Sequence, residues 1–266
     1  MNRIDKKFAD LKKRQKKALI LFMTAGDPSF RRNEELIYQF EADGIDIIEL
    51  GVPFSDPLAD GPVIQASSKR SLEKHTNLKK ILALVKKIRM KSELPILLMS
   101  YLNPILSYGL QRFAKEAASA GVDGLVIPDL PYGEDKSIQN FIENKGMALV
   151  YLLAPTTLES RARQVGQASS GFVYYVSLTG VTGMRDLSLD GIQAKIKNVK
   201  KWVKKPLCVG FGVSTPEQAA KIAKVADGVI IGSYLVRAMA ENQALSAVEF
   251  SKRFIRPFAK VLGKGV

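Results

Sequence analysis

The sequence predicts an α/β protein built as a single (β/α)8 TIM barrel domain over residues 1–266, with an extra N-terminal helix and an inserted helix after strand 2. Two observations predict this fold: short apolar runs rich in β-branched residues recur eight times, and a helical pattern follows each run. Alternating strands and helices give parallel strands with right-handed crossovers, and eight such units close into a barrel. No Pro/Ser-rich linker divides the chain, so we expect one domain.

The eight expected strands are residues 18–26, 45–52, 95–101, 124–130, 148–154, 172–178, 206–212 and 228–233. Between them, apolar residues recur at helical spacing, as in residues 78–90, LKKILALVKKIRM. The basic segment before the first strand carries acids and repeats Ile4, Phe8 and Leu11 at helical spacing. It is therefore expected to be a helix and not a signal peptide. The longest gap, after the second strand, holds a Pro/Gly-rich loop and the inserted helix.

Two carboxylates stand out near the end of the second strand. Residues 45–65, IDIIELGVPFSDPLADGPVIQ, place Glu49 near the end of an apolar run and Asp60 on the loop behind it. Carboxylates are rarely fully buried in a protein unless they are ion-paired or have a function. Barrel enzymes hold their active sites at the carboxyl ends of the strands. We interpret the pair as acid/base groups, with Glu49 desolvated and easily protonated and Asp60 ionised. The structural alternatives are a loop cap for Glu49 and, for Asp60, the N-cap of a helix beginning near Val63.

Glycines cluster after the last three expected strands. They include Gly210 and Gly212 after the seventh strand, and Gly232, which precedes Ser233, after the eighth. A phosphate is held well by backbone N–H groups and a helix N-terminus, and barrels commonly bind phosphate after strands seven and eight. We predict a phosphate site there; the alternative is that these glycines only form tight turns.

Composition excludes several classes of protein. The single cysteine, Cys208, rules out an internal disulfide and is typical of a cytoplasmic protein, and its apolar setting predicts a buried thiol. The only histidine, His75, lies in a polar stretch and is expected on the surface. No apolar run reaches the roughly 18 residues that span a membrane, and no nucleotide-binding or zinc-type spacing is present.

The net charge of +14 is unusual, and its lysines lie mostly in pairs on helix-like segments. We interpret most of them as solvent-facing, with attraction of a phosphorylated substrate, an acidic partner or nucleic acid as open alternatives. Nucleic-acid binding is not expected, because no basic stripe is interleaved with exposed aromatics.

Six stretches carry a family resemblance: GVPFSDPLADGPVIQ (51–65), LMSYLNPI (98–105), DGLVIPDLP (123–131), YYVSLTGVTG (174–183), VGFGVSTPEQ (209–218) and DGVIIGS (227–233). Together they resemble the tryptophan synthase alpha subunit family and cover the chain from the first strand almost to the end. The resemblance implies a barrel that cleaves indole-3-glycerol phosphate to indole and glyceraldehyde 3-phosphate. It implies no cofactor in this chain, and a pyridoxal-phosphate-dependent beta subunit as partner in an alpha2-beta2 tetramer.

The resemblance also implies roles for individual residues. Glu49 becomes the proton shuttle between indole C3 and the side-chain hydroxyl, and Asp60 accepts a hydrogen bond from the indole N–H. Residues 178–185, LTGVTGMR, form a lid, although Met184 stands where the family usually has alanine, and Asp56 signals to the beta subunit. The expected substrate-binding residues are Phe22, Tyr101, Tyr175, Thr182, Gly183, Phe211, Gly212, Gly232 and Ser233, with Thr182 also contacting Asp60.

Two alternatives to this function stay open. In the first alternative, the chain is another phosphate-binding barrel, although such a barrel would have no need of the loop around Asp60. In the second, it is a catalytically silent activator of the beta subunit. Retention of Glu49 and Asp60 argues against the second alternative, since an activator needs neither. Three of the aromatic residues in the expected site, Phe22, Tyr101 and Tyr175, lie on strands, where such side chains more often belong to the core than to a ligand pocket.

Overall fold

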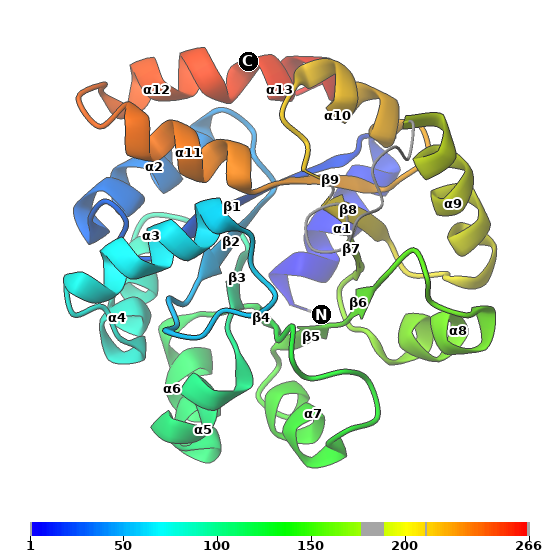
Figure 1. Cartoon of the computed structure of the whole chain (residues 1–266), viewed down its shortest axis with the longest axis horizontal. Helices are drawn as coiled ribbons and strands as arrows, with labels where there is room; N and C mark the ends of the chain where they lie inside the picture. The colour runs from blue at the N-terminus through cyan, green and yellow to red at the C-terminus, as the bar shows by residue number, and fades with distance from the viewer. Residues whose placement is uncertain (1, 177–188, 211, 265–266) are drawn as a thin grey trace.

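The computed structural model describes residues 2–176, 189–210 and 212–264 and forms a barrel of parallel strands surrounded by helices (Figure 1). The strands are β1 (Ala18–Thr24), β2 (Ile47–Gly51), β3 (Ile96–Met99), β4 (Gly124–Val126), β5 (Ala148–Val150), β6 (Leu152–Leu153), β7 (Val173–Val176), β8 (Leu207–Gly210) and β9 (Gly228–Ile231). Their order in the sheet is β5-β4-β3-β2-β1-β9-β8-β7-β6. The predicted barrel is confirmed, with each strand a few residues shorter than its apolar run.

The fifth predicted strand, residues 148–154, is present as two pieces. β5 pairs with β4, and β6 pairs with β7. Tyr151 lies between the two pieces, where its N–H donates to the Ser169 hydroxyl at 3.1 Å while its carbonyl accepts from the Tyr174 N–H at 3.0 Å. A side chain thus replaces one ladder bond, and the barrel closes across this break.

The helices cover the outside of the barrel. In chain order they are α1 (Arg3–Lys13), α2 (Phe30–Ala42), α3 (Pro62–Glu73), α4 (Leu78–Arg89), α5 (Leu102–Tyr108), α6 (Leu110–Ala120), α7 (Lys136–Glu143), α8 (Glu159–Ala168), α9 (Leu189–Trp202), α10 (Pro216–Ala223), α11 (Ser233–Glu241), α12 (Ala247–Phe254) and α13 (Arg256–Val261). The expected N-terminal helix is α1, and the expected inserted helix after the second strand is α3. No helix within the described ranges is long and apolar enough to cross a membrane.

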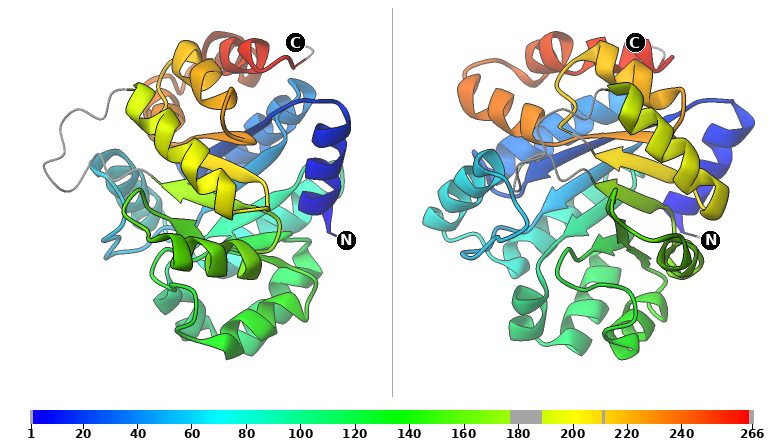
Figure 2. Two further views of the ribbon diagram at one scale, coloured as in Figure 1. Left: turned by 90° about the vertical axis from the view of Figure 1, so that its right-hand side faces the viewer. Right: turned by 45° about the vertical axis from the view of Figure 1, so that its right-hand side comes forward.

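Alternate residues of each strand pack into two separate cores. Leu19, Leu21 and Met23 of β1 face the helices, whereas Ala18 and Ile20 face the inside of the barrel. Helix α1 crosses the end where the strands begin (Figure 2), and its apolar face, predicted from helical spacing, packs into the inner core. The half of the barrel where the strands begin is therefore filled with apolar side chains, and polar inward-facing residues lie at the end where the strands finish.

Aspartates connect neighbouring strands at the end of the barrel where the strands begin. They stand just before β2, β4 and β9, and each accepts the N–H of a residue at the start of the preceding strand, at 2.8 to 2.9 Å: Asp46 from Leu19, Asp123 from Ile96 and Asp227 from Leu207. Each also forms an ion pair, with Lys264, Arg89 and Lys200 respectively. These acids have a structural role.

Candidate active site

Glu49 lies inside the barrel near the carboxyl end of β2. Its register partners are Phe22 on β1 and Leu97 on β3, and its side chain is only 1% exposed. Neither carboxyl oxygen has a hydrogen-bond partner among the described residues, so the loop-cap alternative finds no support there. Burial, with a smaller contribution from the charge of Asp60, raises the pKa of Glu49 from 4.5 to about 8. The site therefore holds a carboxylic acid that is mostly protonated at neutral pH.

Asp60 lies on the loop before α3, half-buried and close enough to act electrostatically on Glu49. Burial raises its pKa from 3.8 to about 6, and a hydrogen bond with Tyr101 opposes that rise. Asp60 thus ionises below neutral pH, as the sequence predicts, although with a raised pKa. The N-cap alternative is wrong, because the N-cap of α3 is Gly61, which has no side chain for capping.

Tyr101 fastens the loop that carries Asp60. Its hydroxyl accepts the N–H of Ala59 at 2.9 Å and also bonds to the Asp60 carboxylate. Its ring lies 5.3 Å from that of Phe54, centre to centre. The predicted site residue Tyr101 is therefore brought to the site, where it holds both ends of the segment between Phe54 and Asp60.

The structure corrects the choice of tyrosine on β7. Tyr175 packs in the outer core against the helices, 1% exposed, and its hydroxyl has no partner among the described residues. Its neighbour Tyr174 pairs with Cys208 and packs against the inner core. Burial and then the charge of Glu49 raise the pKa of Tyr174 well above its usual value. Tyr174, which sequence reasoning missed, is the tyrosine that faces the carboxylates.

Phe22 and Gly210 both take part in packing inside the barrel. Phe22 faces inward, since a Cβ added at Gly51 would lie 2.6 Å from its ring. A Cβ at Gly210 would lie 2.6 Å from the Tyr174 hydroxyl, so Gly210 makes room for that side chain. For Gly210 the structure thus favours a packing role over phosphate binding.

Gly232 and Ser233 stand at the start of α11, as the phosphate prediction requires. Gly232 is the N-cap, and no side chain of the described residues caps the helix. The first N–H groups of a helix have no intrahelical partners, and the helix dipole favours an anion there. A Cβ at Gly232 would make only ordinary contacts, 3.7 Å from Phe22, so packing among the described residues does not require glycine. Gly212 adopts a positive φ of 58° after β8, in keeping with a tight turn.

Some predicted contacts fall outside the described residues. These are Thr182, Gly183 and Phe211, together with the predicted lid at residues 178–185. Asp56 is exposed on the loop between β2 and α3, where it accepts a hydrogen bond from the hydroxyl of Ser55.

Comparison with known proteins gives one consistent result. The family model described as tryptophan synthase alpha chain matches residues 8–260. The tryptophan synthase alpha chain of Geotalea daltonii is 51% identical over 237 residues, 89% of this chain and 90% of that protein. The alpha chain of Geobacter sp. strain M21 is 46% identical over 100% of this chain and 99% of its own. The crystal structure of the alpha subunit from Legionella pneumophila strain Paris superposes with a TM-score of 0.92 at 38% identity, covering 98% of both chains.

Proposed function

Because the chain belongs to the tryptophan synthase alpha chain family, we infer the roles of its residues from the reaction of that family. That reaction is the cleavage of indole-3-glycerol phosphate to indole and glyceraldehyde 3-phosphate in tryptophan biosynthesis, so the chain is a carbon–carbon lyase. The alpha chain of this family carries no cofactor and works with a beta chain, which holds pyridoxal phosphate, in a heterotetramer. The cytoplasmic location inferred from the single cysteine stays a prediction.

Glu49 is the group that moves the proton in this proposal. The observation that carries it is a buried carboxyl without a hydrogen-bond partner among the described residues and with a pKa raised to about 8. Glu49 therefore starts the reaction protonated and gives its proton to indole C3. Its carboxylate then takes the proton of the side-chain hydroxyl as the carbon–carbon bond breaks. The electron pair of that bond restores the indole ring, the aldehyde forms, and Glu49 ends the reaction protonated again.

Asp60 stabilises the charge that appears on the substrate in between. Protonation at C3 leaves a positive charge shared with the indole nitrogen, and the Asp60 carboxylate is ionised at neutral pH and accepts a hydrogen bond from the indole N–H. Tyr101 holds Asp60 in place through its hydroxyl. The two carboxyl groups have different pKa values, so Glu49 acts as the acid and Asp60 supplies the negative counter-charge.

Binding of the substrate uses the rest of the barrel mouth. Phe22 and Tyr174 line the space beside Glu49 and offer apolar contact to the indole ring. The N-terminus of α11, at Gly232 and Ser233, binds the phosphate through backbone N–H groups. The exposed Asp56, on the same loop as Asp60, links the site to the beta chain.

The test measures indole release from indole-3-glycerol phosphate for wild type, Glu49→Gln, Asp60→Asn and Asp56→Asn, each alone and with a tryptophan synthase beta chain. A positioned acid or base contributes about 10² to 10⁴ in rate, so Glu49→Gln should lose at least that factor while still binding substrate. Asp56→Asn is the matched control, because it removes an exposed carboxylate from the same loop and should change only the response to the beta chain. Near-normal cleavage by Glu49→Gln would refute the assignment. A wild-type chain that activates the beta chain without cleaving substrate would favour the silent activator.

A further inference from the structure

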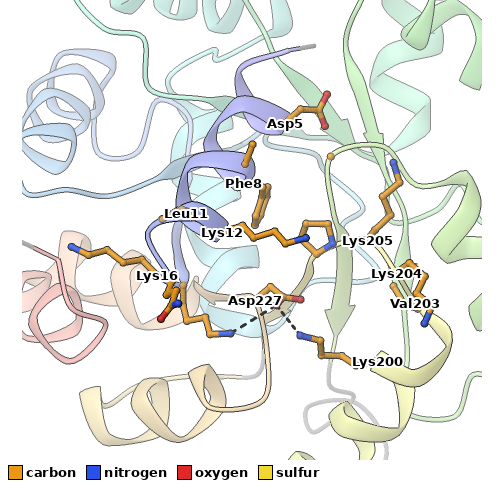
Figure 3. Close-up of a pocket in the computed structure, with 15 residues that line it drawn as sticks. Asp5, Phe8, Leu11, Lys12, Lys16, Lys200, Val203, Lys204, Lys205 and Asp227 are labelled. Carbon is orange, nitrogen blue, oxygen red and sulfur yellow. Dashed lines mark hydrogen bonds and ion pairs between the residues drawn. The ribbon is translucent and has the colours of Figure 1, made fainter.

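A large cavity lies at the opposite end of the barrel from Glu49. Its volume is about 1060 Å³, and α1, the segment after α9 and the turn before β9 enclose it (Figure 3). The segments that enclose it precede strands β1, β7, β8 and β9, whereas Glu49 lies near the carboxyl end of β2. The cavity is therefore separate from the proposed active site.

Lysines dominate the wall of this cavity. Those that line it are Lys12, Lys16, Lys17, Lys200, Lys204 and Lys205. Lys17 and Lys200 both pair with Asp227, at 3.8 Å and 2.7 Å. The other four form no ion pair within the described part of the chain. Among the described residues of the wall, Asp5 is the only further acid, so six lysines stand against two carboxylates and leave an excess of four positive charges.

The fold fixes the two paired lysines of the wall. The Asp227 carboxylate also accepts the N–H of Leu207 at 2.9 Å, which fixes it at the start of β8 and with it the heads of Lys17 and Lys200. Lys12 and Lys204 approach from two different elements, α1 and the segment after α9, and Figure 3 shows both at the cavity. An anion bound between the two segments would be attracted by lysines of both.

The floor of the cavity is apolar. Phe8 and Leu11 of α1 form one side, and Val203 and Pro206 form the other. A site of roughly 300 to 1000 Å³ with an apolar floor and a few charged groups is typical of small-molecule binding. An extended nucleic acid, by contrast, needs a long basic surface to match its evenly spaced phosphates.

We propose that this cavity binds a small molecule carrying a chain of phosphates, which unpaired lysines from its two walls, Lys12 and Lys204 foremost, hold while the apolar floor supports any organic group attached to it. Lysine is suited to phosphate as a compact point charge, and several lysines around one cavity match several adjacent phosphates better than a single carboxylate. The site also accounts for part of the unusual basic charge. Attraction of the phosphorylated substrate does not explain these six lysines, because they lie at the far end of the barrel.

The experiment titrates inorganic tripolyphosphate, ATP and adenosine into the full chain by calorimetry at physiological salt. We expect saturable one-to-one binding of the two phosphate compounds and none of adenosine. Equal affinity for both assigns the site to the phosphate chain alone, and tighter binding of ATP adds recognition of the nucleoside by the floor. The double variant Lys12→Glu, Lys204→Glu should weaken binding roughly tenfold or more.

A charge-matched control decides between a site and general attraction. Lys13→Glu with Lys201→Glu changes the net charge by the same amount. Lys13 lies beside Lys12 on α1, and Lys201 lies near the end of α9, three residues before Lys204; both are exposed, and neither lines the cavity. The control should keep wild-type affinity within about twofold, a difference of under 0.5 kcal/mol. The proposal would be overturned if both double variants weakened binding equally or if binding were not saturable. It would also be overturned if the chain bound duplex DNA more tightly than the phosphate compounds and both double variants lost that DNA binding equally.

Discussion

The buried acid that makes catalysis possible should also destabilise the fold at alkaline pH. In the folded chain the pKa of Glu49 is raised from 4.5 to about 8, first by burial and then by the charge of Asp60. Each pH unit of difference between folded and unfolded pKa corresponds to about 1.36 kcal/mol, so full ionisation in the folded chain costs about 5 kcal/mol. Replacing Glu49 with Gln removes this cost while keeping the shape of the side chain.

The sign of the effect follows from which state holds the proton. Between about pH 4.5 and 8, the unfolded chain has released the Glu49 proton and the folded chain has kept it. The free energy of unfolding therefore falls as pH rises across this window, and the contribution levels off below and above it. In Glu49→Gln this slope is absent, so the variant should gain stability over wild type as pH rises, by at most about 5 kcal/mol, the value that the two pKa values set.

Urea unfolding at pH 5 and pH 8 measures the difference directly. Glu134→Gln, which removes an exposed carboxylate, controls for the loss of one negative charge. We expect the stability gain of Glu49→Gln over wild type to be several kcal/mol larger at pH 8 than at pH 5, and that of Glu134→Gln to stay nearly constant. A gain for Glu49→Gln that does not change between these pH values would mean that Glu49 is solvated, and the argument for a protonated catalytic acid would fail with it.

Three further predictions test the neighbouring residues. The pH profile of kcat/KM should be a bell with limbs near 6 and 8, and Tyr101→Phe should move the acid limb to higher pH, because the lost hydrogen bond holds the pKa of Asp60 down. Steady-state assays should show impaired cleavage for Tyr174→Leu, which removes the ring from the site, and full cleavage for Tyr175→Leu, whose ring packs in the outer core. The reverse result would contradict the placement of the two rings. Asp123→Asn leaves a buried arginine without its carboxylate, so urea titration should show a loss of about 3 to 5 kcal/mol; a loss under 1 kcal/mol would disprove the proposed anchor.

The barrel was predictable because its signal is repeated. Eight apolar runs and the helical patterns between them point to one fold, and an error in any one of them changes little. The position of Glu49 was equally readable, since an acid inside an apolar run is rare enough to stand out. The break at Tyr151 was not, because the Ser169 hydroxyl that replaces the ladder bond comes from a distant part of the chain.

The face of a buried strand is harder to read than its existence. Strands of a parallel barrel are apolar on both sides, so residues 172–176, FVYYV, show no alternation that would separate Tyr174 from Tyr175. Only the register with β8, which pairs Tyr174 with the inward-facing Cys208, assigns the faces. Helix ends are also hard to predict from sequence. The N-cap of α3 is Gly61, one residue after Asp60, and a shift of one residue is within the usual uncertainty of helix ends.

Partners, rather than residue type, separate the structural acids of this barrel from the catalytic one. Asp46 and Glu49 stand three residues apart around the same strand and are both nearly inaccessible to solvent. Asp46 accepts the N–H of Leu19 and pairs with Lys264, so its charge is compensated inside the protein. Glu49 has no such partner among the described residues, and its neighbouring charge, Asp60, has the same sign. The paired Asp46 carboxylate holds its neighbours in place, whereas the unpaired Glu49 carboxyl is available to give and take a proton. The sequence supplies both acids, but only folding decides which of them becomes reactive.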